Sequence, residues 1–126
     1  MIIVDTCGLL WLAEGGDRIS PDVRNRIDSE PIVSVSSISA LEMAMKVRSG
    51  KLTLPIPTLE WWERAVAHHR LNVIAPDPEI MIRSAELPLI HRDPADRIII
   101  ATALHMKAPV VTSDSRFHEY GVETLL

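Results

Sequence analysis

Short runs of β-branched residues alternate along the chain with longer segments in which apolar residues recur at helical spacing. The short runs predict strands at residues 2–4, 32–35, 72–74 and 110–112, and a short edge strand at 122–124. The periodic segments predict helices at residues 6–14, 21–27, 36–47, 59–69, 78–87 and 94–105, and a short helical turn that ends at residue 120. Residues 51–57 contain two prolines and are predicted to be extended.

Local signals mark where several of these helices begin. Ser20 and Asp93 are good capping residues, and each stands directly before a proline, which suits the first position of a helix. Thr58 is predicted to cap the helix at 59–69. The sequence therefore predicts where several helices begin, in addition to their apolar faces.

Helices lie between successive predicted strands, and this order favours a parallel sheet with helices on both faces. The β-branched composition of the strands is typical of strands buried on both sides. We therefore predict an α/β fold, a three-layer α/β/α arrangement around a mainly parallel sheet of four to five strands, with residues 1–126 forming one domain. In such folds the functional groups gather beyond the carboxyl ends of the strands.

Composition narrows the class of protein. The 126 residues are 47% hydrophobic and 24% charged, which is typical of a globular protein. The single cysteine, Cys7, excludes a disulfide framework and a multi-cysteine zinc site, and we expect it to be a small buried residue. The N-terminus lacks the basic region of a signal peptide, and no apolar run is long enough to span a bilayer. We expect a soluble, cytoplasmic protein with no membrane partner.

The charge balance is unfavourable for a passive nucleic-acid coat protein. Seventeen acidic and thirteen basic residues give a net charge of −4 at pH 7, which repels a polyanion on average. The balance still allows an enzyme that gathers acids in one pocket and neutralises them with cations. The positions of the acids therefore matter more than their number.

Four acids stand near the predicted strand ends. Asp5 follows the first strand and Asp114 follows the fourth. Glu42 lies in the helix after the second strand, and Asp96 in the first turn of the helix that leads into the fourth. Each has an ordinary structural explanation: Asp5 and Asp114 as helix caps, Asp96 as a first-turn charge favoured by the helix dipole, and Glu42 as a surface partner of Lys46.

Glu42 indicates that these acids act together. It is embedded in the segment ISALEMAMKV, so its carboxylate must either reach water or face a shared polar site. Several carboxylates in one pocket repel one another and raise their own pKa values, and a divalent cation relieves that repulsion. Oxygen ligands without cysteine or histidine select hard ions, Mg²⁺ or Mn²⁺, over zinc.

Four segments of the chain, in order, resemble the PIN domain (PilT N-terminus) family, and within it the VapC toxins of type II toxin–antitoxin pairs. They are IIVDTCGLLWL, VSSISALEMAMKVRSGKLTLPIP, HRDPADRIIIATAL and VVTSDSRFHEYGVETL, and the resemblance covers nearly the whole chain. The resemblance implies that Asp5, Glu42, Asp96 and Asp114 form a catalytic, metal-binding quartet. It also makes Asp93 a lesser acidic candidate, and it suggests as hydroxyl partners of the metal or its waters Thr6, Thr112 and Ser113.

The resemblance further implies an activity and its partners. The activity is that of an endoribonuclease, a hydrolase that uses Mg²⁺ or Mn²⁺ to cleave phosphodiester bonds in single-stranded RNA. The implied partners are the RNA substrate, a second copy of the chain in a homodimer, and a cognate antitoxin whose tail blocks the acidic groove.

Two other functions fit parts of the sequence. A magnesium-binding phosphoacceptor or phosphotransfer domain also places acids at strand ends, but it requires a lysine near the last strands. The segment APVVTSDSRFHEYG contains none, which counts against that function. A non-catalytic PIN-like interaction module would keep the fold alone, and the presence of all four acids disfavours it.

Several residues allow two interpretations. Trp61 and Trp62 fit either packing against the core or contact with a partner subunit or antitoxin. Arg92 and Arg97 flank the acidic motif and fit either pairing with a carboxylate or contact with an RNA phosphate. One local basic run fits either a solvated face or an RNA path, and it consists of Lys46, Arg48 and Lys51.

The histidines do not form a recognisable metal motif. His68 and His69 are adjacent on a predicted helix and point about 100° apart, so they do not chelate one ion together. His91, His105 and His118 share no ligand spacing with one another. We therefore predict a metal site built from carboxylates alone.

Overall fold

The computed structural model describes residues 1–126, and a five-stranded sheet forms its centre. The strands lie in the order β3-β2-β1-β4-β5, and all four neighbouring pairs are parallel. Their bounds are β1 (Ile2–Val4), β2 (Val33–Ser36), β3 (Asn72–Ile74), β4 (Val110–Val111) and β5 (Thr124–Leu125). The predicted α/β class and parallel sheet are confirmed, with the second and last strands shifted by one or two residues.

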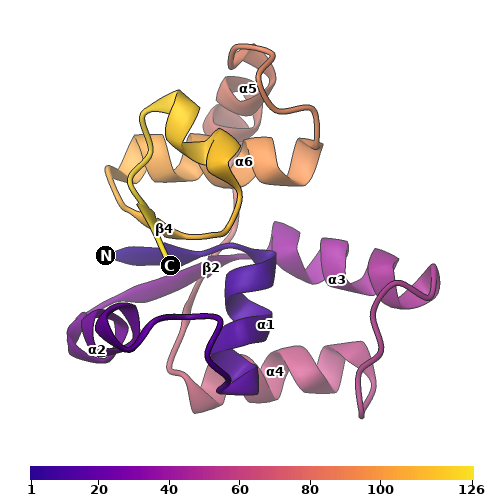
Figure 1. Cartoon of the computed structure of the whole chain (residues 1–126). Coiled ribbons are helices and arrows are strands. Elements are labelled where there is room, and N and C mark those ends of the chain that lie inside the picture. Colours follow the sequence, from indigo (N-terminus) through magenta and orange to yellow (C-terminus); the bar gives the residue numbers. More distant parts are fainter.

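Helices cover both faces of the sheet (Figure 1). One side carries α1 (Thr6–Glu14), α2 (Pro21–Ser29) and α4 (Thr58–His68), with α3 (Ile38–Arg48) extending from the end of the sheet. The other side carries α5 (Pro78–Glu86), α6 (Pro94–Met106) and the 3₁₀ helix η1 (Ser115–Tyr120). No helix combines the length and the apolar character that crossing a membrane requires. The three-layer arrangement is the one predicted from the order of the elements.

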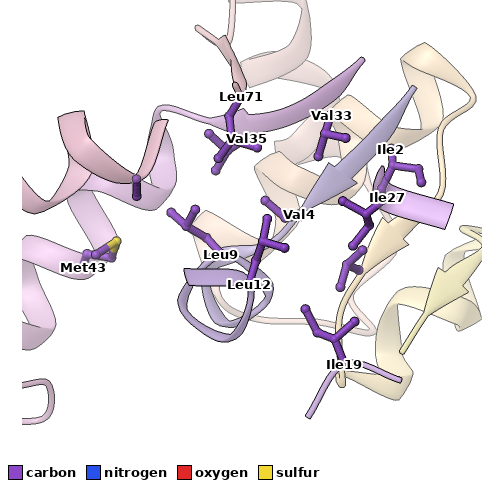
Figure 2. Packing of buried hydrophobic residues seen from close by; sticks show 12 residues of the cluster. Ile2, Val4, Leu9, Leu12, Ile19, Ile27, Val33, Val35, Met43 and Leu71 are labelled. Carbon is purple, nitrogen blue, oxygen red and sulfur yellow. The ribbon is translucent and has the colours of Figure 1, made fainter. Parts of the chain in front are cut away.

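The central strand β1 supplies side chains to two separate cores, because successive residues of a strand point to opposite faces. Ile2 and Val4 pack with Leu9 of α1 and Met43 of α3 in the core shown in Figure 2. Ile3 points the other way, into a second core that contains residues of α6 and η1. All three β1 residues have no exposed surface, which explains the uninterrupted apolar run in the sequence.

Most predicted helix starts are confirmed, and two are wrong. The helix predicted from residue 36 begins at Ile38, because Ser36 still belongs to β2. Ser20 accepts a hydrogen bond from the amide of Val23, as a capping side chain does. Thr58, predicted as a cap, is instead the first residue of α4, and Pro57 precedes it as the N-cap without a side-chain hydrogen bond. The extended conformation of Pro57 ends the 51–57 segment at the point where the helix begins.

Trp61 and Trp62 are both half-buried and pack against the same core as α1 and β1. The packing interpretation of this pair is therefore confirmed. Part of both rings remains exposed, and their contact with a partner subunit or antitoxin stays a prediction.

The start of α1 is packed closely against β4, and this fixes the position of Asp5. A Cβ atom built on Gly8 would lie 2.6 Å from the carbonyl oxygen of Val111 and 3.1 Å from Oδ1 of Asp5. We expect Gly8→Ala to lower the free energy of unfolding by about 1–3 kcal/mol, because backbone must move to admit the methyl group.

Chemical denaturation of the metal-free protein measures this effect. Gly16→Ala is the matched control, because nothing lies within 4 Å of a Cβ atom at Gly16. We expect that variant to change stability by about 0.5 kcal/mol or less. Equal stabilities for the two variants would contradict the close packing at Gly8.

Candidate metal centre

Four elements bring acids to the carboxyl ends of β1 and β4. Asp5 follows β1 and caps α1, with its Oδ1 accepting a hydrogen bond of 2.7 Å from the amide of Gly8. Asp114 follows β4 and caps η1. Glu42 lies in α3, and Asp96 in the first turn of α6. The parallel order of the sheet places these chain segments, far apart in the sequence, at one end of the molecule.

These side chains form one group, here called the acidic cluster: Asp5, Glu42, Asp93, Asp96 and Asp114. Carboxylate oxygens of Glu42, Asp93 and Asp96 lie within 4.8 Å of one another. Oxygens of Asp96 and Asp114 meet the same criterion together with a nitrogen of His91. Asp5 is electrostatically coupled to Glu42, Asp96 and Asp114. The structure thus brings together the four acids that the sequence singled out, and Asp93 with them.

Burial and mutual repulsion raise the pKa values of two members of the cluster. Burial raises the pKa of Asp5 to about 6, against hydrogen bonds from Thr112 and Gly8 that lower it. Burial, followed by the charges of Asp93 and Glu42, raises the pKa of Asp96 to about 7. Without a cation, the acidic cluster is therefore strained electrostatically near neutral pH.

Asp114 behaves differently because it has a cationic partner. Both of its carboxylate oxygens accept hydrogen bonds from the Arg116 guanidinium, at 2.9 and 2.8 Å. These bonds from Arg116 lower the pKa of Asp114 to about 2. Arg116 was not predicted from the sequence, and its side chain is half-exposed beside the acidic cluster.

Two of the three hydroxyl candidates are engaged with protein groups. The buried hydroxyl of Thr6 donates to Oγ of Ser39 over 2.9 Å and so ties α1 to α3. Thr112 hydrogen-bonds the Asp5 carboxylate, and its Oγ1 accepts from the amide of Asp114. Ser113 is exposed. Thr112 is therefore placed to orient two acids of the cluster.

The raised pKa values predict an unusual pH dependence for the metal-free protein. In the folded chain the pKa of Asp5 is about 6 and that of Asp96 about 7, against an ordinary value of 3.8, so both carboxyl groups bind protons more tightly there. These two carboxyl groups therefore hold more protons in the folded than in the unfolded state, and they make stability rise as pH falls from 8 to 5. His69, whose pKa burial lowers, contributes in the opposite direction. Below pH 4 the lowered pKa of Asp114 reverses the trend, because its stabilising charge is lost there.

Urea unfolding in EDTA at pH 8, 7, 6 and 5 measures this dependence. Adding Mn²⁺ should stabilise most at pH 8 and least at pH 5, since protons compete with metal for the same carboxylates. A metal-free stability that falls steadily from pH 8 to pH 5 would contradict the raised pKa values.

Glu42 does not form the surface ion pair that its spacing from Lys46 allows. No ion pair joins the two side chains, and Glu42 instead faces Asp93 and Asp96. Both Glu42 and Lys46 line a cleft of about 490 Å³ between α3 and the start of α6. Lys51 and the exposed apolar side chains of α3 line the same cleft, which opens beside the acidic cluster.

Arg97 is a structural residue, which corrects both of its predicted roles. Its side chain is buried, and Nη1 donates to the carbonyl oxygens of Pro88 and His91 at 3.0 and 2.9 Å. Nη2 donates to the carbonyl oxygens of Ala85 and Leu87 at 3.3 and 2.7 Å. No carboxylate lies within ion-pair distance, and the guanidinium is not accessible to a phosphate.

His91 also lies in the site, although no role was predicted for it from the sequence. Its Nε2 is 2.8 Å from Asp114 Oδ2 and 3.1 Å from Asp96 Oδ2. The partners of His91 are carboxylates from two other segments and not other histidines, so spacing between histidines does not reveal them. Only the fold of the chain brings these groups together.

Cys7 is half-buried near the same site rather than fully buried as predicted. Burial, together with the negative charge of Asp5, raises the pKa of its thiol. The thiol therefore stays protonated at neutral pH and is a poor nucleophile.

The donor set suits a hard divalent ion. The acidic cluster offers carboxylate oxygens from several directions, and only Arg116 and His91 form ion-pair contacts with it. Buried carboxylates that repel one another are stabilised by a cation, and oxygen donors favour Mg²⁺ or Mn²⁺. Fold and site together define a doubly wound α/β protein with an acidic pocket at the carboxyl ends of its strands.

Comparison with known proteins identifies the family. The PIN domain profile matches residues 2–123, so the chain belongs to the PIN domain family. Ribonuclease VapC22 of Mycobacterium tuberculosis (strain ATCC 25618 / H37Rv) is 28% identical over 120 residues, covering 94% of this chain and 91% of that protein.

Solved structures share the fold over almost the whole chain. VapBC2 from Rickettsia felis, bound to a DNA fragment from their promoter, matches with a TM-score of 0.68 and 16% identity, over 98% of this chain and 97% of that one. DNA-bound VapBC from Salmonella typhimurium matches with a TM-score of 0.67 and 21% identity, over 98% and 95%. At these identities the likeness concerns the fold.

Proposed function

We propose that this PIN domain protein is an endoribonuclease that requires Mg²⁺ or Mn²⁺ and cleaves single-stranded RNA. The observation that carries the proposal is the convergence of Asp5, Glu42, Asp96 and Asp114 from four elements into one acidic cluster. An ordinary set of helix caps would not place carboxylates within 4.8 Å of one another at such electrostatic cost. The similarity to a relative named as a ribonuclease supports the same activity.

The quartet would hold the divalent ion, with Asp93 at the edge of the site. When bound, such an ion lowers the pKa of water and stabilises charge on a phosphate. The protein's part is to fix the carboxylates: Asp5 through the amide of Gly8, and Asp114 through Arg116. A carboxylate that is not occupied as a ligand is available to accept the proton of the attacking water.

The cleft beside the acidic cluster supports a path for a single RNA strand. Lys46 and Lys51 line it and offer the positive charge that a net −4 protein lacks on average. The apolar side chains of Leu41 and Met45, which are 55% and 61% exposed, can contact unpaired bases there. A rigid duplex does not present its bases to such a surface, which favours a single-stranded substrate.

The proposed biological role is that of the toxin in a type II toxin–antitoxin pair in the cytoplasm. The sequence resemblance to VapC toxins supports this role, and so does the similarity in fold to VapBC proteins. A cognate antitoxin and a second copy of the chain are the proposed protein partners. An arginine from the antitoxin would pair well with the acidic cluster, as Arg116 does with Asp114.

Glu42→Gln tests whether Glu42 belongs to the functional quartet. Glutamine keeps the shape of the side chain but removes one of the charges that raise the pKa of Asp96. We therefore expect a higher melting temperature of the metal-free protein, together with weaker Mn²⁺ binding and slower cleavage of a fluorescent single-stranded RNA. A surface ion pair would give the opposite pattern, a small loss of stability with full activity.

Glu63→Gln is the matched control, because Glu63 is an exposed residue of α4 without an ion pair. The same assay should show no cleavage in EDTA and none of a duplex of the same sequence. Metal-independent cleavage by the parent protein would overturn the proposed function.

A further inference from the structure

His91 contacts three members of the acidic cluster although it is almost completely buried, with 1% of its surface exposed. Its Nε2 lies 2.8 Å from Asp114 Oδ2 and 3.1 Å from Asp96 Oδ2. Its Nδ1 lies 3.1 Å from the backbone nitrogen of Asp93. One imidazole ring therefore joins the start of α6 to the turn after β4, across the site.

The contact with Asp93 fixes which ring nitrogen carries hydrogen. A backbone amide is only a donor, so Nδ1 of His91 must accept from Asp93. A neutral imidazole that accepts at Nδ1 carries its hydrogen on Nε2. The Nε2–H group points at the carboxylates of Asp96 and Asp114 and donates to them. A nitrogen that carries hydrogen has no lone pair for a metal, so His91 is oriented to bind carboxylates rather than the ion.

Several further contacts hold the backbone and the ring of His91. The backbone amide of His91 donates to the Tyr120 hydroxyl over 2.7 Å, and its carbonyl accepts from Arg97 over 2.9 Å. The Tyr120 hydroxyl in turn donates to the carbonyl oxygen of Pro88. The ring also meets the buried Phe117 edge to face, with 6.1 Å between centroids. Hydrogen bonds therefore hold the backbone of His91, and packing against Phe117 holds its ring.

We propose that His91 is a positioning residue, which holds Asp96 and Asp114 in the geometry that binds metal by donating its Nε2–H to both. This role rests on the proposed function, since it gives the acidic cluster its metal-binding shape. Each carboxylate keeps lone pairs free for an ion while one of its oxygens accepts from His91. Supporting hydrogen bonds of this kind fix the orientation of ligands, and losing one typically costs about 10–100-fold in metal affinity.

Two substitutions of similar polarity distinguish the effect of the Nε2–H donor from that of the other contacts of the ring. His91→Gln places an amide NH₂ near the position of Nε2 and keeps a donor for Asp96 and Asp114. His91→Asn reaches only the position of Nδ1, so it can still accept from Asp93 but offers the two carboxylates no donor. We expect Mn²⁺ affinity, measured by calorimetry, to fall about 10–100-fold in His91→Asn and about 3-fold or less in His91→Gln. With saturating Mn²⁺, cleavage by His91→Asn should show a lower kcat and an unchanged KM for RNA.

The outcomes distinguish this role from its alternatives. Unchanged Mn²⁺ affinity in His91→Asn, with both variants merely less heat-stable, would mean that His91 only packs the core, and it would overturn the proposal. Equal and large losses in both variants would mean that an imidazole lone pair binds the ion, which also overturns it. A parent protein that binds no Mn²⁺ would overturn the proposed function itself, and so is distinguishable from a failure at His91.

A second measurement uses the unaltered, metal-free protein and does not depend on whether the variants fold. Long-range ¹H–¹⁵N correlation spectra report which nitrogen of each histidine carries hydrogen. The proposal requires the Nε2–H form for His91. The Nδ1–H form would overturn it.

Discussion

Replacing Asp96 by asparagine is expected to abolish metal-dependent RNA cleavage while making the metal-free protein more stable. Asp96 has the most strongly raised pKa of the acidic cluster, about 7, because it is half-buried and faces four other acids. Asparagine keeps its shape and removes a charge that costs stability at pH 8. We expect the free energy of unfolding to rise by about 1 kcal/mol or more. We also expect the cleavage rate to fall by at least about 100-fold, because losing a metal ligand costs more than losing a residue that only supports one.

The matched control is Asp22→Asn. Asp22 also lies in the first turn of a helix, α2, but it is exposed and remote from the cluster. If the role of Asp96 were only to complement the helix dipole, both variants would lose a few tenths of a kcal/mol and both would keep full activity. Thermal melts in EDTA and cleavage rates in Mn²⁺ distinguish the two cases.

Arg97→Met is expected to cause the largest loss of stability. The buried guanidinium donates to four carbonyl oxygens between residues 85 and 91. Methionine would remove all of these donors, and the carbonyl oxygen of Pro88 would keep the Tyr120 hydroxyl as a partner. Each unsatisfied buried group costs about 1–3 kcal/mol, so we expect a total loss of about 3 kcal/mol or more. The segment that Arg97 holds also carries His91, so Mn²⁺ affinity should fall even at temperatures where the variant is folded.

Arg92→Met is the control for the loss of charge. Arg92 belongs to the same motif, but it is exposed and forms no hydrogen bond or ion pair. We expect it to change stability by about 0.5 kcal/mol or less. Similar losses from both substitutions, measured by urea denaturation, would show that the net charge of the motif matters rather than the bonds of Arg97.

The sequence was sufficient to predict the fold because its signals were local and consistent. The β-branched run at Ile2–Val4 and the proline that follows Asp93 each indicate one structure, and the order of strands and helices implies a parallel sheet. Thr58 was misplaced by one position because threonine is a good cap, whereas the rigid proline before it already sets the start of α4. Local signals therefore predict the type of an element more reliably than its first residue.

The acids of the site were predictable because they follow strand ends or stand in an otherwise apolar helix. The residues around them were not, because their contacts cross long stretches of chain. His91 meets Asp114 from 23 residues away, and Tyr120 binds the amide of His91 from 29 residues away. Arg97 looks like a charged surface residue in the sequence, yet its partners are backbone carbonyls that carry no sequence signature. Such contacts become visible only in the folded chain.

Anomalous diffraction from a crystal of the protein soaked in MnCl₂ tests the central claim most directly. A manganese peak is expected in the acidic cluster, within coordination distance of carboxylate oxygens that include those of Asp5 and Asp96. His91 should stay hydrogen-bonded to Asp96 and Asp114, outside the coordination sphere. A fully soaked crystal that shows no manganese in the acidic cluster would contradict the account.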